Sequence, residues 1–238
     1  MYFDQNEYDV RFEWGLAGVQ ALAPVSGVMI IVDVLSFTTC VDIVVDNGGF
    51  VLPYRGPAES LAEYAAANGA LYADRKRGGE GAYSLSPSSL ITIPEGTRLV
   101  LPSPNGSTLS LATGDMFTVA GCLRNAGAVA AKAAQLGKRI GVIAAGERWP
   151  DGSLRPSLED LIGAGAIIEY LDGRRSPEAE MATAVFHNSQ PDLLNTLLHC
   201  GSGKELVGRG FEADVRLAAQ MNVSGAVPLL VDGIYGGF

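Results

Sequence analysis

The stretch Met29-Ile-Ile-Val-Asp-Val-Leu-Ser-Phe-Thr-Thr39 decides the fold of this chain. Its first four residues are an unbroken apolar run, which is typical of a strand covered on both faces in a parallel or mixed sheet. Asp33 follows at the carboxyl end of that strand, and Ser36, Thr38 or Thr39 can cap the helix that comes next. Ligands of open α/β sheets bind outside the carboxyl ends of strands. An acid beside free helix amides can hold a metal ion or a phosphate-bearing substrate; the alternative is that Asp33 only completes the turn.

The composition is that of a globular protein with an acidic balance. Of the 238 residues, 47% are hydrophobic and 18% are charged, which excludes a disordered chain. No apolar run approaches the roughly 20 residues of a membrane span. The first residues lack the basic and apolar order of a secretion signal, so we expect a cytoplasmic protein without membrane partners. With 17 Lys and Arg against 26 Asp and Glu, a basic face for nucleic acid is not expected.

The few sulfur and imidazole ligands narrow the choice of metal. The cysteines, Cys40, Cys122 and Cys200, lie far apart and form no Cys-x-x-Cys pair. This spacing makes disulfide and zinc frameworks unexpected. The chain has only two histidines, which argues against imidazole-rich metal sites. A metal, if present, would be a hard ion with oxygen ligands such as Mg²⁺.

Strand and helix patterns alternate along the chain, which predicts an α/β sheet with helices packed on it. We find no linker, and expect one domain over residues 1–238 with a helix-rich segment at about 155–225. A loop over 74–90, rich in charge, glycine and serine, is long enough to be functional. Besides the opening strand and helix, the expected strands are 8–13 (at an edge), 50–54, 71–73, 97–101, 117–120, 139–145 and 227–231; the expected helices are 57–67, 126–137, 157–171, 177–188, 191–200, 202–208 and 211–222.

Three of these strands run into polar turns, at 33–39, 103–108 and 146–160. If the strands are parallel neighbours, the turns share one edge of the sheet. Carboxylates at this edge would hold a metal ion, and cationic and amide groups would bind an anion or phosphate oxygens. The carboxylates are Asp33, Glu147, Glu159 and Asp160; the cations are Arg124, Arg148, Arg155 and the run Arg75-Lys76-Arg77; the phosphate-binding candidates are Asn105, Ser107, Thr108 and backbone amides.

Each of these residues also has a plainer interpretation. Glu159 and Asp160 follow Ser157 at the start of a helix, where capping and the helix dipole favour acids. Asn105-Gly106 is a common turn pair. The basic run at 75–77 fits a solvated loop equally well. The hypothesis of a site therefore depends on these groups coming together.

Familiar phosphatase and nucleotide-binding motifs are absent. Cys200 is followed six residues later by Leu206, where a cysteine-phosphatase loop needs Arg. Lys204 precedes Glu205 instead of the Ser or Thr of a Walker loop. Leu35 stands where an aspartyl-phosphate motif would have a second Asp after Asp33. No Gly-x-Ser-x-Gly elbow or dinucleotide fingerprint follows a strand.

Successive blocks of the sequence resemble the 2-phosphosulfolactate phosphatase (ComB-like) family. They occur in the family's order and cover almost the whole chain, so the combination is more specific than any single block. The blocks are Val32-Asp-Val-Leu-Ser-Phe-Thr-Thr39, Ser103-Pro-Asn-Gly-Ser-Thr108, Gly121-Cys-Leu-Arg-Asn-Ala126, Ser157-Leu-Glu-Asp-Leu161 with Gly163-Ala-Gly165, and Ser202-Gly-Lys-Glu-Leu206 with Gly210-Phe-Glu-Ala-Asp-Val215.

The resemblance implies a three-layer α/β/α fold with a mixed, largely parallel sheet and a Mg²⁺-dependent acid phosphatase. The reaction would convert 2-phospho-3-sulfolactate to 3-sulfolactate and phosphate, a step of coenzyme M biosynthesis. By position, the family's site residues correspond best to Asp33, Asn105, Ser107, Glu159 and Asp160.

Taken together, these observations give one set of predicted roles and two mechanisms. We expect attack by water, with a covalent intermediate on Asp33 as the alternative, and a homodimer as the assembly. The catalytic candidates are Asp33, Glu159 and Asp160; the metal ligands are Asp33, Glu147 and Glu159; the substrate-binding candidates are Ser36, Thr38, Lys76, Arg77, Asn105, Ser107, Thr108, Arg124 and Arg148.

The chain departs from the family pattern at two places. Ser36 stands where the archaeal pattern usually has Arg, and Asp74-Arg-Lys-Arg-Gly-Gly-Glu80 replaces a Gly-Glu-Arg-Gly-Gly loop. These differences bear on sulfonate specificity more than on the fold. They favour an alternative in which the chain binds anionic metabolites, or acts on another phosphoester.

Overall fold

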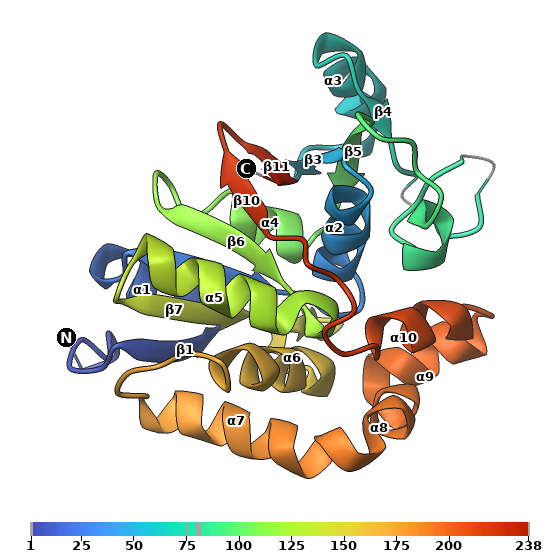
Figure 1. Ribbon diagram of the computed structural model, residues 1–238. Helices are drawn as coiled ribbons and strands as arrows, with labels where there is room; N and C mark the ends of the chain where they lie inside the picture. Colours follow the sequence, from blue (N-terminus) through green and yellow to red (C-terminus); the bar gives the residue numbers. More distant parts are fainter. Residues whose placement is uncertain (1, 75, 80–81, 238) are drawn as a thin grey trace.

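Nine strands form one twisted sheet in a computed structural model that describes residues 2–74, 76–79 and 82–237 (Figure 1). Their order is β1-β7-β2-β6-β10-β11-β3-β5-β4. The strands β1, β7, β2 and β6 are parallel to one another, and so are β3, β5 and β4, with the β10–β11 hairpin antiparallel between the two groups. The strands are β1 Val10–Trp14, β2 Val28–Val32, β3 Phe50–Tyr54, β4 Leu71–Tyr72, β5 Arg98–Pro102, β6 Phe117–Gly121, β7 Ile140–Ala144, β10 Pro228–Val231 and β11 Ile234–Gly237.

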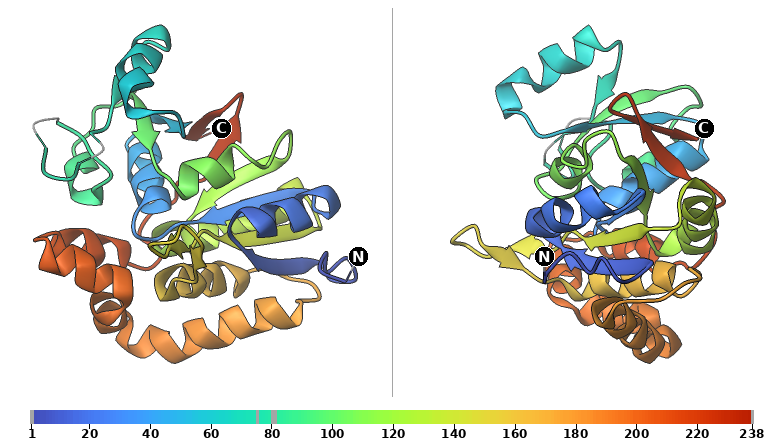
Figure 2. Two further views of the ribbon diagram at one scale, coloured as in Figure 1. Left: turned by 180° about the vertical axis from the view of Figure 1, so that it is seen from behind. Right: turned by 90° about the vertical axis from the view of Figure 1, so that its left-hand side faces the viewer.

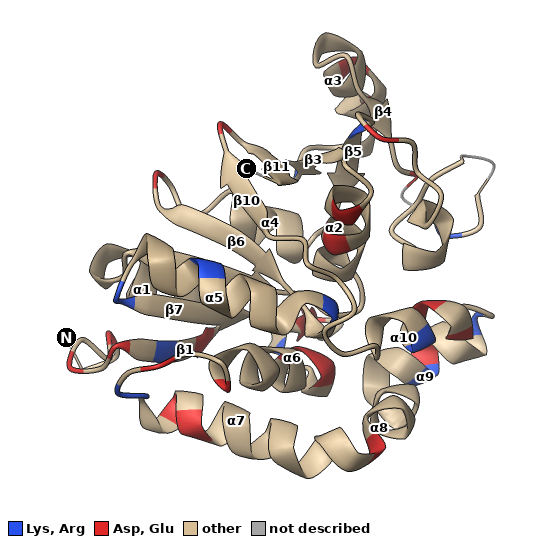
Figure 3. Ribbon diagram, viewed as in Figure 1, with Lys and Arg blue, Asp and Glu red and all other residues tan. Residues whose placement is uncertain are grey.

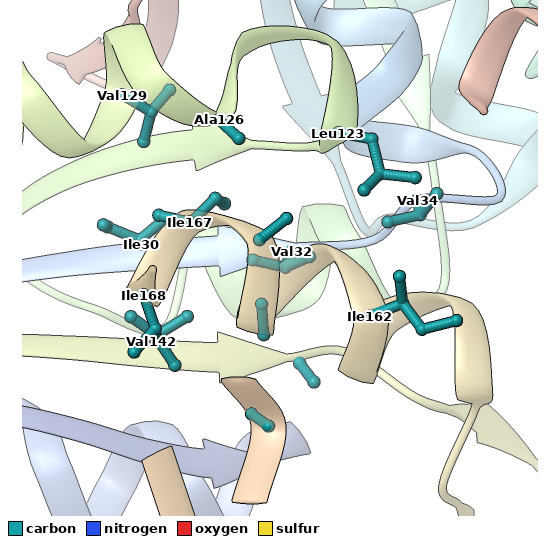
Figure 4. Close-up of a cluster of buried hydrophobic side chains, with 14 of the residues drawn as sticks. Ile30, Val32, Val34, Leu123, Ala126, Val129, Val142, Ile162, Ile167 and Ile168 are labelled. Carbon is teal, nitrogen blue, oxygen red and sulfur yellow. The ribbon is translucent and has the colours of Figure 1, made fainter. Parts of the chain in front are cut away.

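Helices cover both faces of the sheet, because each central strand is apolar on both sides. On one face, Ile30 and Val32 of β2 pack against Ile167 of α6 (Leu158–Ile168) and Val129 of α5 (Ala126–Leu136), as Figure 4 shows. On the other face, Met29 and Ile31 pack under α1 (Gly15–Leu22) and α4 (Gly106–Ser110), seen from behind in Figure 2. In the second half of the sheet, α2 (Phe37–Asp46) and α3 (Leu61–Ala67) cover β3 and β5. The predicted α/β/α architecture with a mixed, largely parallel sheet is confirmed.

The helix-rich segment packs outside α6 and extends past the carboxyl end of β2. Helix α7 (Pro177–Ser189) lies so close to α6 that a Cβ on Gly165 would be 2.1 Å from the carbonyl oxygen of Ala182. The chain then continues through α8 (Leu193–His199), α9 (Gly201–Gly208) and α10 (Glu212–Ala218), below α2 at the right of Figure 1. Within the described residues, no helix is long and apolar enough to cross a bilayer.

The structure corrects several sequence-based expectations. The turn predicted at 103–108 contains the short helix α4, and the 146–160 segment contains the hairpin β8–β9 (Glu147–Arg148 and Leu154–Arg155). Ser36 precedes α2, but its side chain makes no capping bond. The first turn of the predicted helix 57–67 is a 3₁₀ turn, Ala58–Ser60.

The expectation that β2, β5 and β7 are parallel neighbours is half wrong. Strands β2 and β7 pair in parallel, whereas β5 belongs to the group that runs the opposite way across the β10–β11 hairpin. Adjacent strands rotate by about 20–25° each, and β5 is five strands from β2 in the sheet order. The turn after β5 nevertheless reaches the carboxyl end of β2, where Gly106 contacts Asp33.

Candidate active site

Asp33 lies between the end of β2 and the start of α2, and its carboxylate is held by two backbone amides. Its Oδ1 accepts a hydrogen bond from the amide of Phe37 at 3.2 Å, and its Oδ2 accepts one from the amide of Gly106 at 2.9 Å. Thr38 fixes the backbone, since its hydroxyl accepts from the Asp33 amide and donates to the Asp33 carbonyl. Asp33 thus caps α2 itself, in place of the hydroxyl residues that the sequence favoured.

Gly106 is required for this contact because of a close approach. A Cβ at Gly106 would lie 2.2 Å from a ring carbon of Phe37 and 2.8 Å from Asp33 Oδ2. The preceding residue, Asn105, donates from its side-chain amide to Glu147 Oε2 at 3.0 Å. Two consecutive residues therefore connect Asp33, after β2, with Glu147, after β7.

Asp160 joins the ends of β2 and β7. Its Oδ1 accepts from the amide of Val34 at 2.7 Å, and its Oδ2 accepts from the amide of Gly146 at 2.9 Å and from the hydroxyl of Ser157 at 2.7 Å. Burial, followed by the charges of Asp33 and Glu159, raises the pKa of Asp160 well above its usual value. With three donors already bound, Asp160 holds the two strand ends and fixes the first turn of α6.

Glu159, its neighbour, is buried but unsatisfied. Only 2% of its surface is exposed, and no donor among the described residues reaches its Oε2 atom. The thiol of Cys200 lies beside it; burial and then the Glu159 charge raise the pKa of Cys200 to about 12. A buried carboxylate oxygen without a donor is costly, so this atom is available to a ligand.

The carboxylates are close enough to influence one another. Burial raises the pKa of Asp33 to about 6, with the charge of Glu159 adding to the shift. Burial raises the pKa of Glu147 to about 7, and the charges of Asp33 and Glu159 add to it. We call Asp33, Glu147 and Glu159 the carboxylate cluster; the pKa values of Asp33 and Glu147 stay raised although the charges of Arg77 and Arg155 oppose the rise.

The charges of two arginines act on this cluster. Arg77 donates to the hydroxyl of Ser36 at 3.0 Å, and its charge opposes the rise in the pKa of Asp33. Arg155 donates to the hydroxyl of Ser202 at 3.2 Å, and its charge opposes the rise in the pKa of Glu147.

The other predicted cations lie apart from the cluster or are exposed. Arg148 is exposed and bonds to the carbonyl of Gly152, and Lys76 is exposed as well. Arg124 is paired with Asp42 at 2.8 Å. Arg75 lies outside the described residues.

A cavity of about 210 Å³ opens beside Glu147. Asn105, Thr108 and Arg148 give it polar walls, while Trp14 and three leucines give it apolar ones. Ser107 does not face it, because its buried hydroxyl donates to the carbonyl of Leu101. This cavity is large enough for a small organic acid.

Comparisons of the sequence with known proteins identify the family. The sequence model of the 2-phosphosulpholactate phosphatase family matches residues 19–233. The chain belongs to this family. It is 32% identical over 211 residues to 2-phosphosulfolactate phosphatase of Methanothermobacter thermautotrophicus, covering 87% of this chain and 88% of that protein.

Two proteins named as probable 2-phosphosulfolactate phosphatases are similar as well. The one from Gloeobacter violaceus is 30% identical over 83% of this chain and 85% of its own length. The one from Thermosynechococcus vestitus is 32% identical over 64% of this chain and 67% of its own length. As a member of the 2-phosphosulpholactate phosphatase family, the chain is a hydrolase of phosphoric monoesters.

The carboxylate cluster of this family member fits Mg²⁺. Among the described residues, no group of three or more Asp, Glu, His or Cys side chains is placed so that it could hold a metal ion by itself. Mg²⁺ does not need such a group, because it commonly binds one or two carboxylates and completes its shell with water and substrate phosphate. The unpaired Glu159 Oε2 and the mutual repulsion of Asp33 and Glu147 are what a hard cation would relieve.

Sequence reasoning did not predict the contacts of several residues that build this site. The amide of Gly106, the hydroxyl of Ser157 and the thiol of Cys200 each touch a cluster residue or its support. Asp214 was quoted within a family block without a role, yet it holds Arg77. Backbone donors leave no side-chain signature, which is why the Gly106 contact could not be read from the sequence.

Proposed function

We propose that this chain is a Mg²⁺-dependent phosphomonoesterase that hydrolyses 2-phospho-3-sulfolactate, or a closely related multiply anionic phospho-acid, to the hydroxy acid and phosphate. The observation that carries the proposal is the carboxylate cluster, in which the acids raise one another's pKa and Glu159 Oε2 has no donor among the described residues. The names of the relatives support the substrate.

The residues of the chain would divide the work. Carboxylates of Asp33, Glu147 and Glu159 would hold Mg²⁺ together with water, and the ion would supply positive charge to the phosphate oxygens when bound. Arg77 and Arg155, whose charges act on Asp33 and Glu147, would neutralise the charge of the departing phosphate. Asn105 keeps Glu147 in place, and the cavity beside it accepts the organic part of the substrate.

The contacts of Asp33 support attack by water over attack by Asp33. Each of its two oxygens already accepts a backbone hydrogen bond, which holds the carboxylate and lowers its nucleophilicity. We therefore expect no phosphorylated chain in intact-protein mass spectra of acid-quenched turnover. A phosphorylated Asp33 would replace this mechanism with a covalent one.

The proposal is tested by phosphate release from a panel of phosphorylated hydroxy acids, with Mg²⁺ and with EDTA. We expect release only with Mg²⁺, and a kcat/KM for the sulfonate substrate at least about tenfold above that for 2-phospholactate, which lacks one anionic group. A chain that is stabilised against heat by these acids yet releases no phosphate is a binder, and that result overturns the proposal.

A further inference from the structure

Asp214 is the most heavily bonded acid outside the carboxylate cluster. It is fully buried in the first turn of α10 and accepts hydrogen bonds from the hydroxyl of Ser86, from the amide and hydroxyl of Ser88, and from Arg77. These donors come from residues 77–88, more than 120 positions away in the sequence. Asp214 therefore joins α10 to the region before β5.

Arg77 is fixed between three groups. Its Nη1 bonds to Asp214 at 2.8 Å, its Nη2 bonds to the hydroxyl of Ser36 at 3.0 Å, and its guanidinium carbon lies 5.9 Å from the ring centre of Phe211. A planar guanidinium bound at two nitrogens and packed on an aromatic ring has little freedom to rotate. Ser36 lies three residues after Asp33, so this geometry holds the cation at the carboxylate cluster.

The charges support this arrangement. An unpaired arginine here could extend into water, as the side chain of Lys76 next to it does. Instead the Arg77 side chain is only 10% exposed, and its charge opposes the rise in the pKa of both Asp33 and Cys40. Figure 3 shows that Lys and Arg are scattered over the ribbon and form no basic patch in this view. A single arginine held by specific contacts can supply positive charge at the site.

We infer that Asp214 is a positioning residue, which holds the guanidinium of Arg77 against Ser36 so that it binds the phosphate of the substrate beside Asp33. This inference rests on the proposed function, since it assigns a role within the same site. Asp214 itself does not touch the substrate. Its contribution passes through Arg77.

A double-mutant cycle tests the inference. Inorganic phosphate is titrated in the presence of Mg²⁺ by calorimetry into the wild type, Asp214→Asn, Arg77→Ala and the double variant, and kcat and KM are measured on the same samples. We expect each single variant to weaken phosphate binding and to raise KM about tenfold or more. The double variant should bind phosphate within about twofold of the single variant that binds it more weakly. The inference is overturned if the losses of phosphate affinity in the two single variants multiply in the double variant. It is also overturned if a folded Asp214→Asn chain keeps the phosphate affinity of the wild type.

Two controls separate positioning from mere support of the fold. Ser88→Ala removes a donor to Asp214 without touching Arg77, and Glu212→Gln alters an exposed acid on the same helix that pairs with Arg216. Both should keep phosphate affinity within about twofold, whatever they do to the melting temperature. A loss in Ser88→Ala equal to that in Asp214→Asn would make the role purely structural.

Chemical rescue covers the case in which Asp214→Asn does not fold. Guanidinium ion added to Arg77→Ala should restore phosphate release in a saturable way, because Asp214 and Ser36 remain to bind it. Absence of saturable rescue contradicts the inference. If the wild type neither binds nor releases phosphate, the proposed function fails, and this inference fails with it; if the wild type does both and the cycle is additive, only the inference fails.

Discussion

Two buried acids on either side of the start of α2 differ in what surrounds them. Asp42 faces Arg124, whose Nε atom is 2.8 Å away, and Ser224 also opposes the rise in its pKa that burial causes. Asp33 accepts from backbone amides and lies near another acid, Glu159, which pushes its pKa further up, and the charge of Arg77 opposes this rise only in part. The charge of Asp42 is neutralised by Arg124, although its Oδ1 atom, like Oε2 of Glu159, has no hydrogen-bond partner among the described residues. Asp33 needs a partner from outside, and this difference distinguishes a site from a structural ion pair.

The largest effect should come from Asp33→Asn. If Asp33 helps to hold Mg²⁺ as proposed, loss of this charge should lower phosphate release by about 10³-fold or more. Steady-state assays of phosphate release measure it. Asp46→Asn, an exposed acid at the end of the same helix, is the matched control and should keep full activity. Near-normal turnover in Asp33→Asn would remove Asp33 from the mechanism.

Asp42→Asn should act on stability instead of chemistry. It leaves the guanidinium of Arg124 buried without its carboxylate, which costs about 3–5 kcal/mol. Urea unfolding measures the loss, and folded molecules should retain the kcat of the wild type. If turnover per folded molecule fell as it does in Asp33→Asn, the contrast between the two acids would be wrong.

The pH dependence of stability should report on the burial of Asp33 and Glu147. A raised folded-state pKa means that the native state binds the proton more tightly than the unfolded state, so stability falls as pH rises. For Asp33 this loss occurs between its ordinary value of 3.8 and about 6, and amounts to on the order of 2–3 kcal/mol. For Glu147 it occurs between 4.5 and about 7, and is smaller because that side chain is partly exposed.

Chemical unfolding in EDTA at pH 5 and pH 8 checks this. The wild type and Asp46→Asn should lose this contribution as the pH rises, whereas Asp33→Asn should lack it. Addition of Mg²⁺ at pH 8 should restore stability to the wild type. If the stability of Asp33→Asn depended on pH as strongly as that of the wild type, the carboxyl of Asp33 would not be desolvated in the wild type.

The smallest effect should come from Arg148→Ala. This residue borders the cavity but is exposed, and exposed charges contribute roughly 0.2–1 kcal/mol. We expect a rise in KM of about two- to fivefold with kcat unchanged, measured with the best substrate of the panel. A large loss of kcat would mean that Arg148 contacts the phosphate itself.

The sequence predicted well what depends on local pattern. The apolar run of β2 and the polar residues after it located Asp33, and similar runs located β6 and β7. Ser157 was correctly placed before α6, yet its hydroxyl donates to Asp160 instead of capping the helix. The type and position of most elements follow from such short segments.

Long-range partners could not be predicted from the sequence. Arg124 was a candidate for substrate, and its pairing with Asp42, 82 positions away, depends on how α2 packs against the turn after β6. The bond from Asn105 to Glu147 likewise joins the turn after β5 to the hairpin after β7, and β5 and β7 belong to oppositely directed groups of the large sheet. Only the folded chain decides which acid meets which cation.

Calorimetric titration of Mg²⁺ with inorganic phosphate at pH 8 tests the central claim most directly, comparing the wild type with Glu159→Gln. The substitution keeps the shape of a side chain whose Oε2 atom accepts no hydrogen bond from the part of the chain that the structure describes, so the fold should persist. We predict one Mg²⁺ bound per wild-type chain and binding weakened at least about tenfold in Glu159→Gln. Equal Mg²⁺ affinity in the two proteins would contradict the account.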